Sequence, residues 1–424
     1  MKPTANNPKY SVVLPTLNGA ETLSVTMPAM LRAIERDDVE WVISDNHSDD
    51  HTYQLIAGLG DPRVRLVQPP QRLPAGQHLE FAYSQARGEW QGHLGDDDYL
   101  FPSRFAVLDE IIAHSQATLV RGEYVRYHWP DYPNEEFANG LDARTFSNSL
   151  RIIRGSDLAA LSLNERVVYG GGAWCVHHSI IEQVRARCGF FSSPQHVEFF
   201  AMRAAMTLSP TVALTELPIY VIGRHEKSSI SQAIRPKSET THSRWDWSFE
   251  DPDPWQYNPF QYKGYAPISL DAALMVRALF PEYLGHAQIN WLYWIIAIFV
   301  DLGTMIRHEQ LPPEAIEIFR CGLQQLPPRT RLRWWLSQRP LLEQLAITLR
   351  AMLKPTAAQP TAPALRSISG RPFRQFGWAE TLYGETIGVH SIVEVPRWVE
   401  GTFSWFFPSA GPSSRCKTGG SSHK

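Results

Sequence analysis

Residues 95–102 read Gly-Asp-Asp-Asp-Tyr-Leu-Phe-Pro, and this acidic stretch decides how the first part of the chain is interpreted. The apolar residues 90–94 before it predict the end of a short buried strand, and Ser103 after it is placed to cap a helix. Three adjacent carboxylates repel one another, and the repulsion grows when they leave water. A solvated, helix-capping turn is one interpretation. A divalent cation that grips a phosphate-bearing ligand explains all three acids and is the preferred one.

The ninety residues before this turn alternate between strand and helix signals. Residues 10–14 (YSVVL), 40–44 (EWVIS) and 64–67 are short apolar runs, and residues with helical spacing separate them. This pattern predicts an α/β fold with a Rossmann-like, mostly parallel sheet flanked by helices. Ligands bind beyond the carboxyl ends of such strands. We therefore expect the loops at 15–18, 45–50 and 96–98 to meet at one edge of the sheet.

The phosphate-binding glycine motifs of dinucleotide and P-loop proteins are missing after the first strand. If phosphates bind at this edge, a cation held by carboxylates has to do what backbone amides do in those folds. Candidate cations are Mn²⁺ and Mg²⁺.

The whole chain has 424 residues and a net charge of −3, which gives no electrostatic reason to expect a nucleic-acid partner. Its four cysteines are scattered and no apolar leader is visible, so we expect a cytoplasmic protein. The apolar run 289–300 (INWLYWIIAIFV) is too short to span a bilayer. It predicts a buried helix or an interfacial one, and the second alternative implies peripheral contact with the cytoplasmic face of a membrane.

The composition along the chain predicts three parts. Residues 1–245 carry the α/β pattern, and residues 246–353 contain an aromatic loop followed by helices, the first capped by Ser269 and another opened by Pro312-Pro313. Residues 354–424 are rich in Pro, Ala and Ser and are expected to form a linker and a mostly flexible tail.

The segments 10–18, 45–50 and 96–102, in this order and spacing, resemble the nucleotide-sugar domain of family 2 glycosyltransferases with the A-type fold. The resemblance covers residues 9–231, a little over half of the chain. It implies a metal-dependent, inverting transfer of a sugar from a nucleoside diphosphate sugar to a hydroxyl of a glycan, a lipid-linked sugar or a small acceptor. Such an activity belongs to glycan or polysaccharide synthesis.

The same resemblance implies roles for individual residues. Asp97 corresponds to the metal ligand and Asp96 to a ligand of the ribose or of the metal's waters, while Asp98 orients its neighbours. His225 is a candidate to complete the metal shell. The remaining residues implied to bind the nucleotide sugar are Pro15, Leu17, Asn18, Asp45, Arg72 and Arg224.

Two further positions follow from the resemblance. Glu198, at the first turn of a predicted helix, corresponds to the general base, with His196 as the fallback; a helix-N-terminal acid is the structural alternative. Gly171, Gly172 and Trp174 lie where the acceptor loop is expected, although a plain flexible turn explains the glycines equally well.

Two other classes of protein remain open at this point. A nucleotidyltransferase has a related sheet, but it is expected to carry a glycine-rich loop where this chain has Pro15 to Gly19. A non-catalytic sugar- or nucleotide-binding protein that keeps the fold is the other alternative. It is favoured by Gly95 and Val197, where the family usually has acidic residues.

Overall fold

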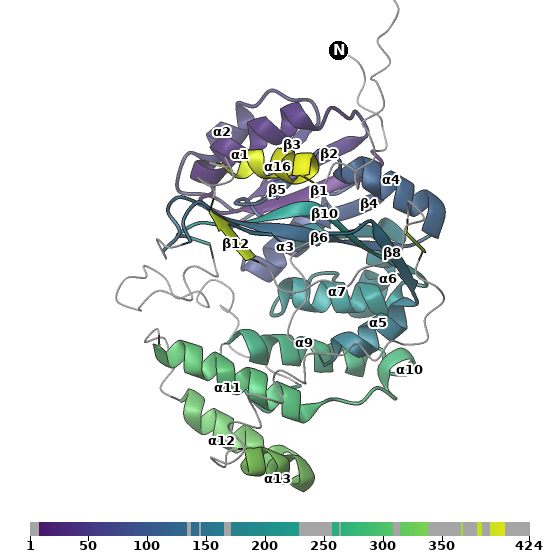
Figure 1. Cartoon of the computed structure of the whole chain (residues 1–424), viewed down its shortest axis with the longest axis vertical. Coiled ribbons are helices and arrows are strands. Elements are labelled where there is room, and N and C mark those ends of the chain that lie inside the picture. Colours follow the sequence, from purple (N-terminus) through teal and green to yellow (C-terminus); the bar gives the residue numbers. More distant parts are fainter. Residues whose placement is uncertain are drawn as a thin grey trace, which may run out of the picture.

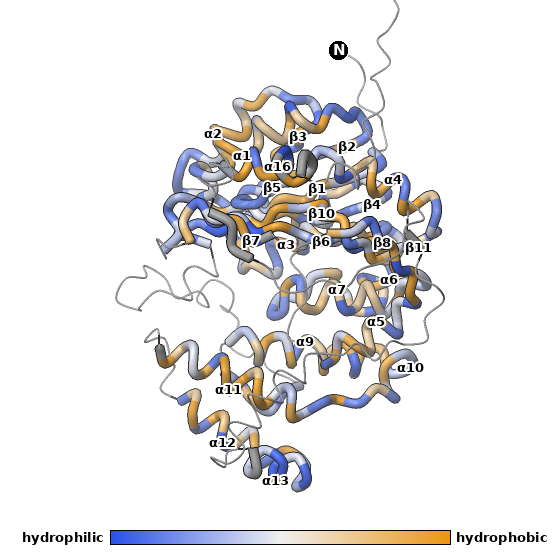
Figure 2. The backbone as a smooth tube through the Cα atoms, viewed as in Figure 1, coloured by the Kyte–Doolittle hydropathy of each residue, from blue (hydrophilic) through white to orange (hydrophobic). Residues whose placement is uncertain are grey.

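A computed structural model of the chain describes residues 8–133, 137–143, 146–164, 171–228, 257–262, 264–307, 314–337, 366–367, 380–383 and 391–402. Figure 1 shows a twisted sheet with helices on both faces and a stack of further helices at one end of the molecule. Figure 2 shows apolar residues concentrated along the central strands.

The first part of the sheet is parallel, as the strand and helix signals predict. The order β4-β1-β2-β3 is formed by parallel pairs throughout, and Thr16 at the end of β1 lies opposite Asp45 at the end of β2. The elements are β1 (Tyr10–Thr16), α1 (Ala20–Ala33), β2 (Val39–Asp45), α2 (Thr52–Ala57), β3 (Val64–Val67), α3 (Ala75–Ser84) and β4 (Trp90–His93).

The second part of the sheet is mixed. The antiparallel strand β9 lies between β4 and β6, and β6 and β10 form the longest parallel ladder. The predicted α/β class with a helix-flanked sheet is confirmed. The elements are β5 (Tyr99–Leu100), α4 (Arg104–Ser115), β6 (Leu119–His128), β7 (Gly140–Ala143), β8 (Ser149–Ile153), α5 (Gly155–Ser162), η1 (Gly171–Ala173), β9 (Trp174–His177), α6 (His178–Cys188), α7 (Val197–Leu208) and β10 (Val212–Arg224).

The predicted helices after the α/β part are present. They are α9 (Tyr265–Leu279), α10 (Pro281–Leu284), α11 (Trp291–Arg307), α12 (Ala315–Gln325) and α13 (Pro328–Ser337). Helix α9 packs on α7, α11 packs on α9, and α13 packs on α11. Pro312 and Pro313 lie outside the described residues, just before α12. Among the described residues, no helix is long and apolar enough to cross a membrane.

Two expected helix caps differ from the prediction. Ser269 lies inside α9, where its hydroxyl accepts a hydrogen bond from Arg203 Nη2 at 3.0 Å. A residue that is distant in sequence caps the N-terminus of α9 instead: Asp301 on α11 accepts a hydrogen bond from the backbone amide of Ala266 at 2.6 Å. Ser103 does precede α4, but its side chain makes no capping hydrogen bond.

The prediction of a mostly flexible tail is wrong for residues 391–402. They form η3 (Ile392–Glu394) and α16 (Val395–Thr402), which pack on α1 at the far end of the sheet (Figure 1). Ile392, Val395 and Val399 are fully buried, so an apolar stripe overrides the polar composition around it. In addition, β11 (Arg366–Ser367) pairs with β8 and β12 (Glu380–Tyr383) pairs with β7. The rest of the tail lies outside the described residues.

Candidate active site at the acidic turn

Asp98 fixes the acidic turn in place. Its carboxylate is buried and accepts hydrogen bonds from the Gly95 amide at 3.0 Å, the Gly223 amide at 2.9 Å and the Tyr220 hydroxyl at 2.8 Å. These donors come from the turn itself and from β10. Asp98 therefore makes the contacts of an orienting residue, and both of its oxygens are occupied by protein donors.

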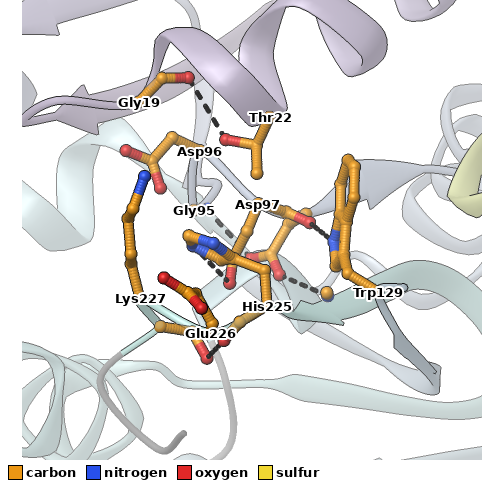
Figure 3. A network of polar contacts seen from close by, with 12 residues as sticks. Gly19, Thr22, Gly95, Asp96, Asp97, Trp129, His225, Glu226 and Lys227 are labelled. Atoms are coloured by element: carbon orange, nitrogen blue, oxygen red, sulfur yellow. Dashed lines mark hydrogen bonds and ion pairs between the residues drawn. The ribbon is translucent and has the colours of Figure 1, made fainter. Parts of the chain in front are cut away.

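Asp96 and Asp97 differ from Asp98 in what surrounds them (Figure 3). Asp96 Oδ2 accepts from Thr16 Oγ1 at 2.7 Å, which ties the acidic turn to the end of β1. The backbone carbonyl of Asp97 accepts from Trp129 Nε1 at 3.1 Å, whereas its carboxylate lies 3.9 Å from His225 Nε2. Burial raises the pKa of Asp96, and burial together with the charges of Asp98 and Asp96 raises the pKa of Asp97 well above its ordinary range.

Within the described residues, burial and the mutual repulsion of these carboxylates outweigh the positive charge of Arg224. Burial also lowers the pKa of His225, so that ring is a neutral imidazole near neutral pH and offers a lone pair rather than a positive charge. Within the described part of the chain, no three His, Cys, Asp or Glu side chains gather closely enough to hold a metal ion. Mg²⁺ sites that use one or two carboxylates plus substrate phosphates do not need such a cage, and the donor set fits a site of that kind.

The three predicted loops do meet at one edge of the sheet. Thr16 is the register partner of Asp45 and the hydrogen-bond donor to Asp96, so a single residue joins all three. Gly19 follows closely: a Cβ there would lie 2.6 Å from Asp96 Oδ2. The convergence of strand ends inferred from the sequence is thus confirmed.

Asp45 is fully buried at this edge. Its carboxylate accepts from the hydroxyl of Ser48, and Gln68 Nε2 donates to Oδ2 at 2.7 Å. Gln68 therefore holds the carboxylate in place. Asn18 is exposed, with a left-handed φ of 59°, and its Oδ1 accepts from the Asp49 amide at 2.7 Å.

The other predicted nucleotide-binding residues lie around this loop pair. Pro15 is half-buried at the end of β1, and Leu17 beside it is exposed. Arg72 is exposed and pairs with Asp49 at 3.2 Å. Arg224, at the end of β10, is largely buried, which lowers its pKa, and its positive charge lowers the pKa of Asp97. All four side chains therefore flank the edge that carries Asp45 and the acidic turn.

Glu198 lies in the first turn of α7, as predicted, and its charge reaches Tyr220, which donates to Asp98. Burial raises the pKa of Tyr220, and the charges of Asp98, Asp97 and Glu198 add to this effect. Glu198 also raises the pKa of the buried Tyr83 on α3. One buried tyrosine thus lies within electrostatic range of both the acidic turn and Glu198.

The segment that leads into Glu198 is tightly held. Val197 has a φ of 46°, a left-handed conformation that typically costs a β-branched residue about 1–3 kcal/mol. His196 beside it is buried and hydrogen-bonded on both nitrogens, to Ser193 Oγ at 2.9 Å and to Asp271 Oδ2 at 2.8 Å. Both ring nitrogens are therefore engaged by protein partners, which hold His196 in place, and its fallback role as base stays a prediction.

The predicted acceptor residues are only partly where a sugar would reach them. Trp174 is fully buried between β4 and β6, so its predicted role in stacking on a sugar is wrong. Gly172 is buried as well: a Cβ there would lie 2.4 Å from the Tyr220 ring, and its carbonyl accepts from Arg104. Close packing therefore explains this glycine. Gly171 begins η1, and the residues before it lie outside the described part.

The structure adds residues that the sequence reasoning missed. Thr16 lies in a loop that was singled out, but only the fold shows that its hydroxyl meets Asp96. Lys227, two residues after His225, pairs with Glu21 of α1 at 2.9 Å. Trp129 had no local signal, since its contact with Asp97 joins positions 32 residues apart.

Comparison with known proteins agrees with this geometry. Residues 11–175 match the sequence model of a family described as glycosyl transferase family 2. The succinoglycan biosynthesis protein ExoO of Rhizobium meliloti is 34% identical over 97 residues, which are 23% of this chain and 28% of that protein. Glycosyltransferase AglD of Haloferax volcanii is 28% identical over 166 residues, 37% of this chain and 26% of that protein. The alignments thus span less than a third of each relative.

Among solved structures, S. aureus TarS 1–349 in complex with UDP-GlcNAc aligns with 76% of this chain and 82% of its own, at 12% identity and a TM-score of 0.46. The sequence match covers the ends of β1 and β2 and the acidic turn, whereas Glu198, Arg224 and His225 lie beyond it. Residues 11–175 of this chain are therefore similar in sequence to glycosyl transferase family 2.

Proposed function

We propose that the chain is a metal-dependent, inverting glycosyltransferase that moves a sugar from a nucleoside diphosphate sugar to a hydroxyl acceptor in glycan or polysaccharide synthesis. The single observation that carries this proposal is the contrast within the acidic turn. Asp98 is saturated by protein donors, whereas Asp97 is a largely buried carboxylate whose ionised form is disfavoured by burial, Asp98 and Asp96 and only partly compensated by Arg224. The match of residues 11–175 to the sequence model of the family supports the class of reaction.

In this proposal the donor lies along the edge where β1, β2 and the acidic turn meet. Pro15, Leu17 and Asn18 flank the base, and Asp45 faces it from a position fixed by Gln68. Asp97, Asp96 and His225 hold Mn²⁺ or Mg²⁺ together with the diphosphate. The ion supplies charge neutralisation for the leaving diphosphate.

Glu198 is the general base of the proposed reaction. It takes the proton of the acceptor hydroxyl while the acceptor oxygen forms a bond to the anomeric carbon. The bond from that carbon to the diphosphate oxygen breaks, and the nucleoside diphosphate leaves with the electron pair. Two features fix the start of α7: the left-handed backbone of Val197 and the two hydrogen bonds of the His196 ring. They restrict where the Glu198 carboxylate lies.

A thermal-shift screen of nucleoside diphosphates and their sugars, with and without Mn²⁺, tests donor binding. A ligand at about a hundred times its Kd stabilises the native state by roughly 2.7 kcal/mol. Asp97→Ala should abolish the Mn²⁺-dependent part of this shift. Asp157→Ala is the matched control, because Asp157 is an exposed acid of α5 paired only with Arg154 in the described structure.

Sugar transfer to a panel of glycan, lipid-linked and small hydroxyl acceptors tests the chemical step. Glu198→Gln should keep Mn²⁺-dependent donor binding and lose transfer, whereas Glu182→Gln on the exposed face of α6 should change neither. Full activity in Glu198→Gln would remove the base assignment. Donor binding without transfer to any acceptor would instead identify a non-catalytic binding protein.

A further inference from the structure

We propose that the exposed face of α13 is a docking surface for an anionic lipid bilayer. This proposal goes beyond the transferase reaction and does not depend on it. Helix α13 lies at the end of the long axis of the molecule opposite to α2 (Figure 1). The outward face of α13 is therefore placed at an extremity rather than between packed elements.

The residues of α13 divide into two faces. Leu332 and Trp335 are three positions apart on one side of the helix and are 56% and 53% exposed. Arg331 lies on one flank of this apolar pair, and Arg329 and Arg333 lie on the other, all three exposed. An apolar stripe bordered by arginines is the arrangement of helices that lie in a membrane interface.

The opposite face of α13 is anchored to the protein. The Trp334 ring is half-buried, 5.4 Å from the Phe299 ring on α11 and 6.0 Å from the Phe319 ring on α12. This cluster fixes which side of the helix points outward.

The charge of the surface identifies its partner. Helix α13 carries three arginines and no acidic residue, although the chain as a whole has a net charge of −3. On the neighbouring α12, Glu317 pairs with Arg320 at 3.6 Å, and Glu314 lies at its start. Arginines at an interface contact lipid phosphates while Leu332 and Trp335 enter the acyl boundary. A nucleic acid offers the phosphates but no apolar layer for these two side chains.

Vesicle flotation with the full chain tests the proposal. The vesicles contain phosphatidylcholine alone or phosphatidylcholine mixed with the anionic lipid phosphatidylglycerol, and no nucleotide or acceptor is present. We expect binding to the anionic vesicles only. The double variant Arg329→Glu/Arg333→Glu should weaken it about 30-fold or more, from the contribution of each basic residue near an anionic surface. Leu332→Ser/Trp335→Ser should weaken it by at least about tenfold.

Matched variants separate this face from general effects of charge and exposure. Arg32→Glu/Arg87→Glu makes the same change in net charge on exposed arginines elsewhere, and Tyr53→Ser removes an exposed aromatic side chain from α2. Both should bind as the unchanged protein does. Equal binding of all variants, or no binding to anionic vesicles, would overturn the proposal. A dimer that only the α13 variants dissociate would assign the face to self-association and would also overturn it.

Discussion

Asp271→Ala should destabilise the protein severely, although Asp271 lies outside the α/β part. The Asp271 carboxylate is fully buried and accepts three hydrogen bonds: from His196 Nε2 at 2.8 Å, the Tyr257 amide at 3.0 Å and the Asn258 amide at 2.7 Å. Alanine leaves three buried donors without an acceptor. At about 1–2 kcal/mol each, the expected loss is roughly 3–6 kcal/mol. This loss is a large part of the free energy of unfolding of a typical domain, which is about 5–15 kcal/mol.

The assay is urea denaturation followed by tryptophan fluorescence and by circular dichroism. Asp271→Asn is the matched control, because its amide oxygen still accepts from the two backbone amides. Its NH₂ group donates to His196 once the imidazole proton moves to Nδ1, where Ser193 Oγ accepts it. The asparagine variant should therefore lose no more than about 1–2 kcal/mol.

A loss below about 1 kcal/mol in Asp271→Ala would refute this reasoning, because it would mean that the three donors find water or other partners. Under the proposed function the asparagine variant also reports on Glu198. Since His196 borders Val197 and Glu198, a shift of its ring should lower kcat more than it raises KM. An unchanged kcat would show that the pair is purely structural.

Three further predictions concern other parts of the α/β unit. Burial lowers the pKa of His78 to about 4, so the unfolded chain binds a proton before the folded chain does as the pH falls. His78 alone should therefore lower stability by about 2 kcal/mol between pH 7 and pH 5. His93, whose pKa burial also lowers to about 4, adds a similar slope, so His78→Gln should remove only the part due to His78 in thermal melts. Asp97→Asn should raise the melting temperature of the metal-free protein, because the ionised carboxylate is disfavoured at this position. The same change should reduce the stabilisation of the protein by Mn²⁺. A lower melting temperature of the metal-free variant would contradict this reasoning. Gly223→Ala places a Cβ 1.7 Å from the Asp97 carbonyl oxygen and should abolish Mn²⁺-dependent nucleotide binding, whereas Gly303→Ala, with open space around it, should not.

The strands that position the site were predictable because each is a short apolar run ended by a polar or proline-containing loop. Residues 10–14, 40–44, 64–67 and 90–94 all form or lie within parallel strands, apart from the final residue of the last run. The order of strands then fixes where their ends meet. The sequence also predicted an orienting role for Asp98 that differs from the role of Asp97. The three donors that bind Asp98 were not predictable, because they come from residues up to 125 positions away.

What the sequence did not predict depends on contacts between distant segments. Ser269 has the right chemistry for a helix cap, but Asp301, 35 residues away from Ala266, satisfies the start of α9 instead. Trp174 looks like a sugar-stacking residue, and only its place between two strands shows that it is buried. The packing of residues 391–402 on α1 is non-local in the same way.

That last contact bears on how the protein is made. Helix α1 is synthesised near the beginning of the chain, yet the side chains of Ile392, Val395 and Val399 that pack against its region arrive more than 350 positions later. During translation the apolar surface that they cover is exposed to the cell until residues 392–399 have emerged. The α/β unit can therefore complete its folding only after that point, and until then it is open to chaperones and to aggregation.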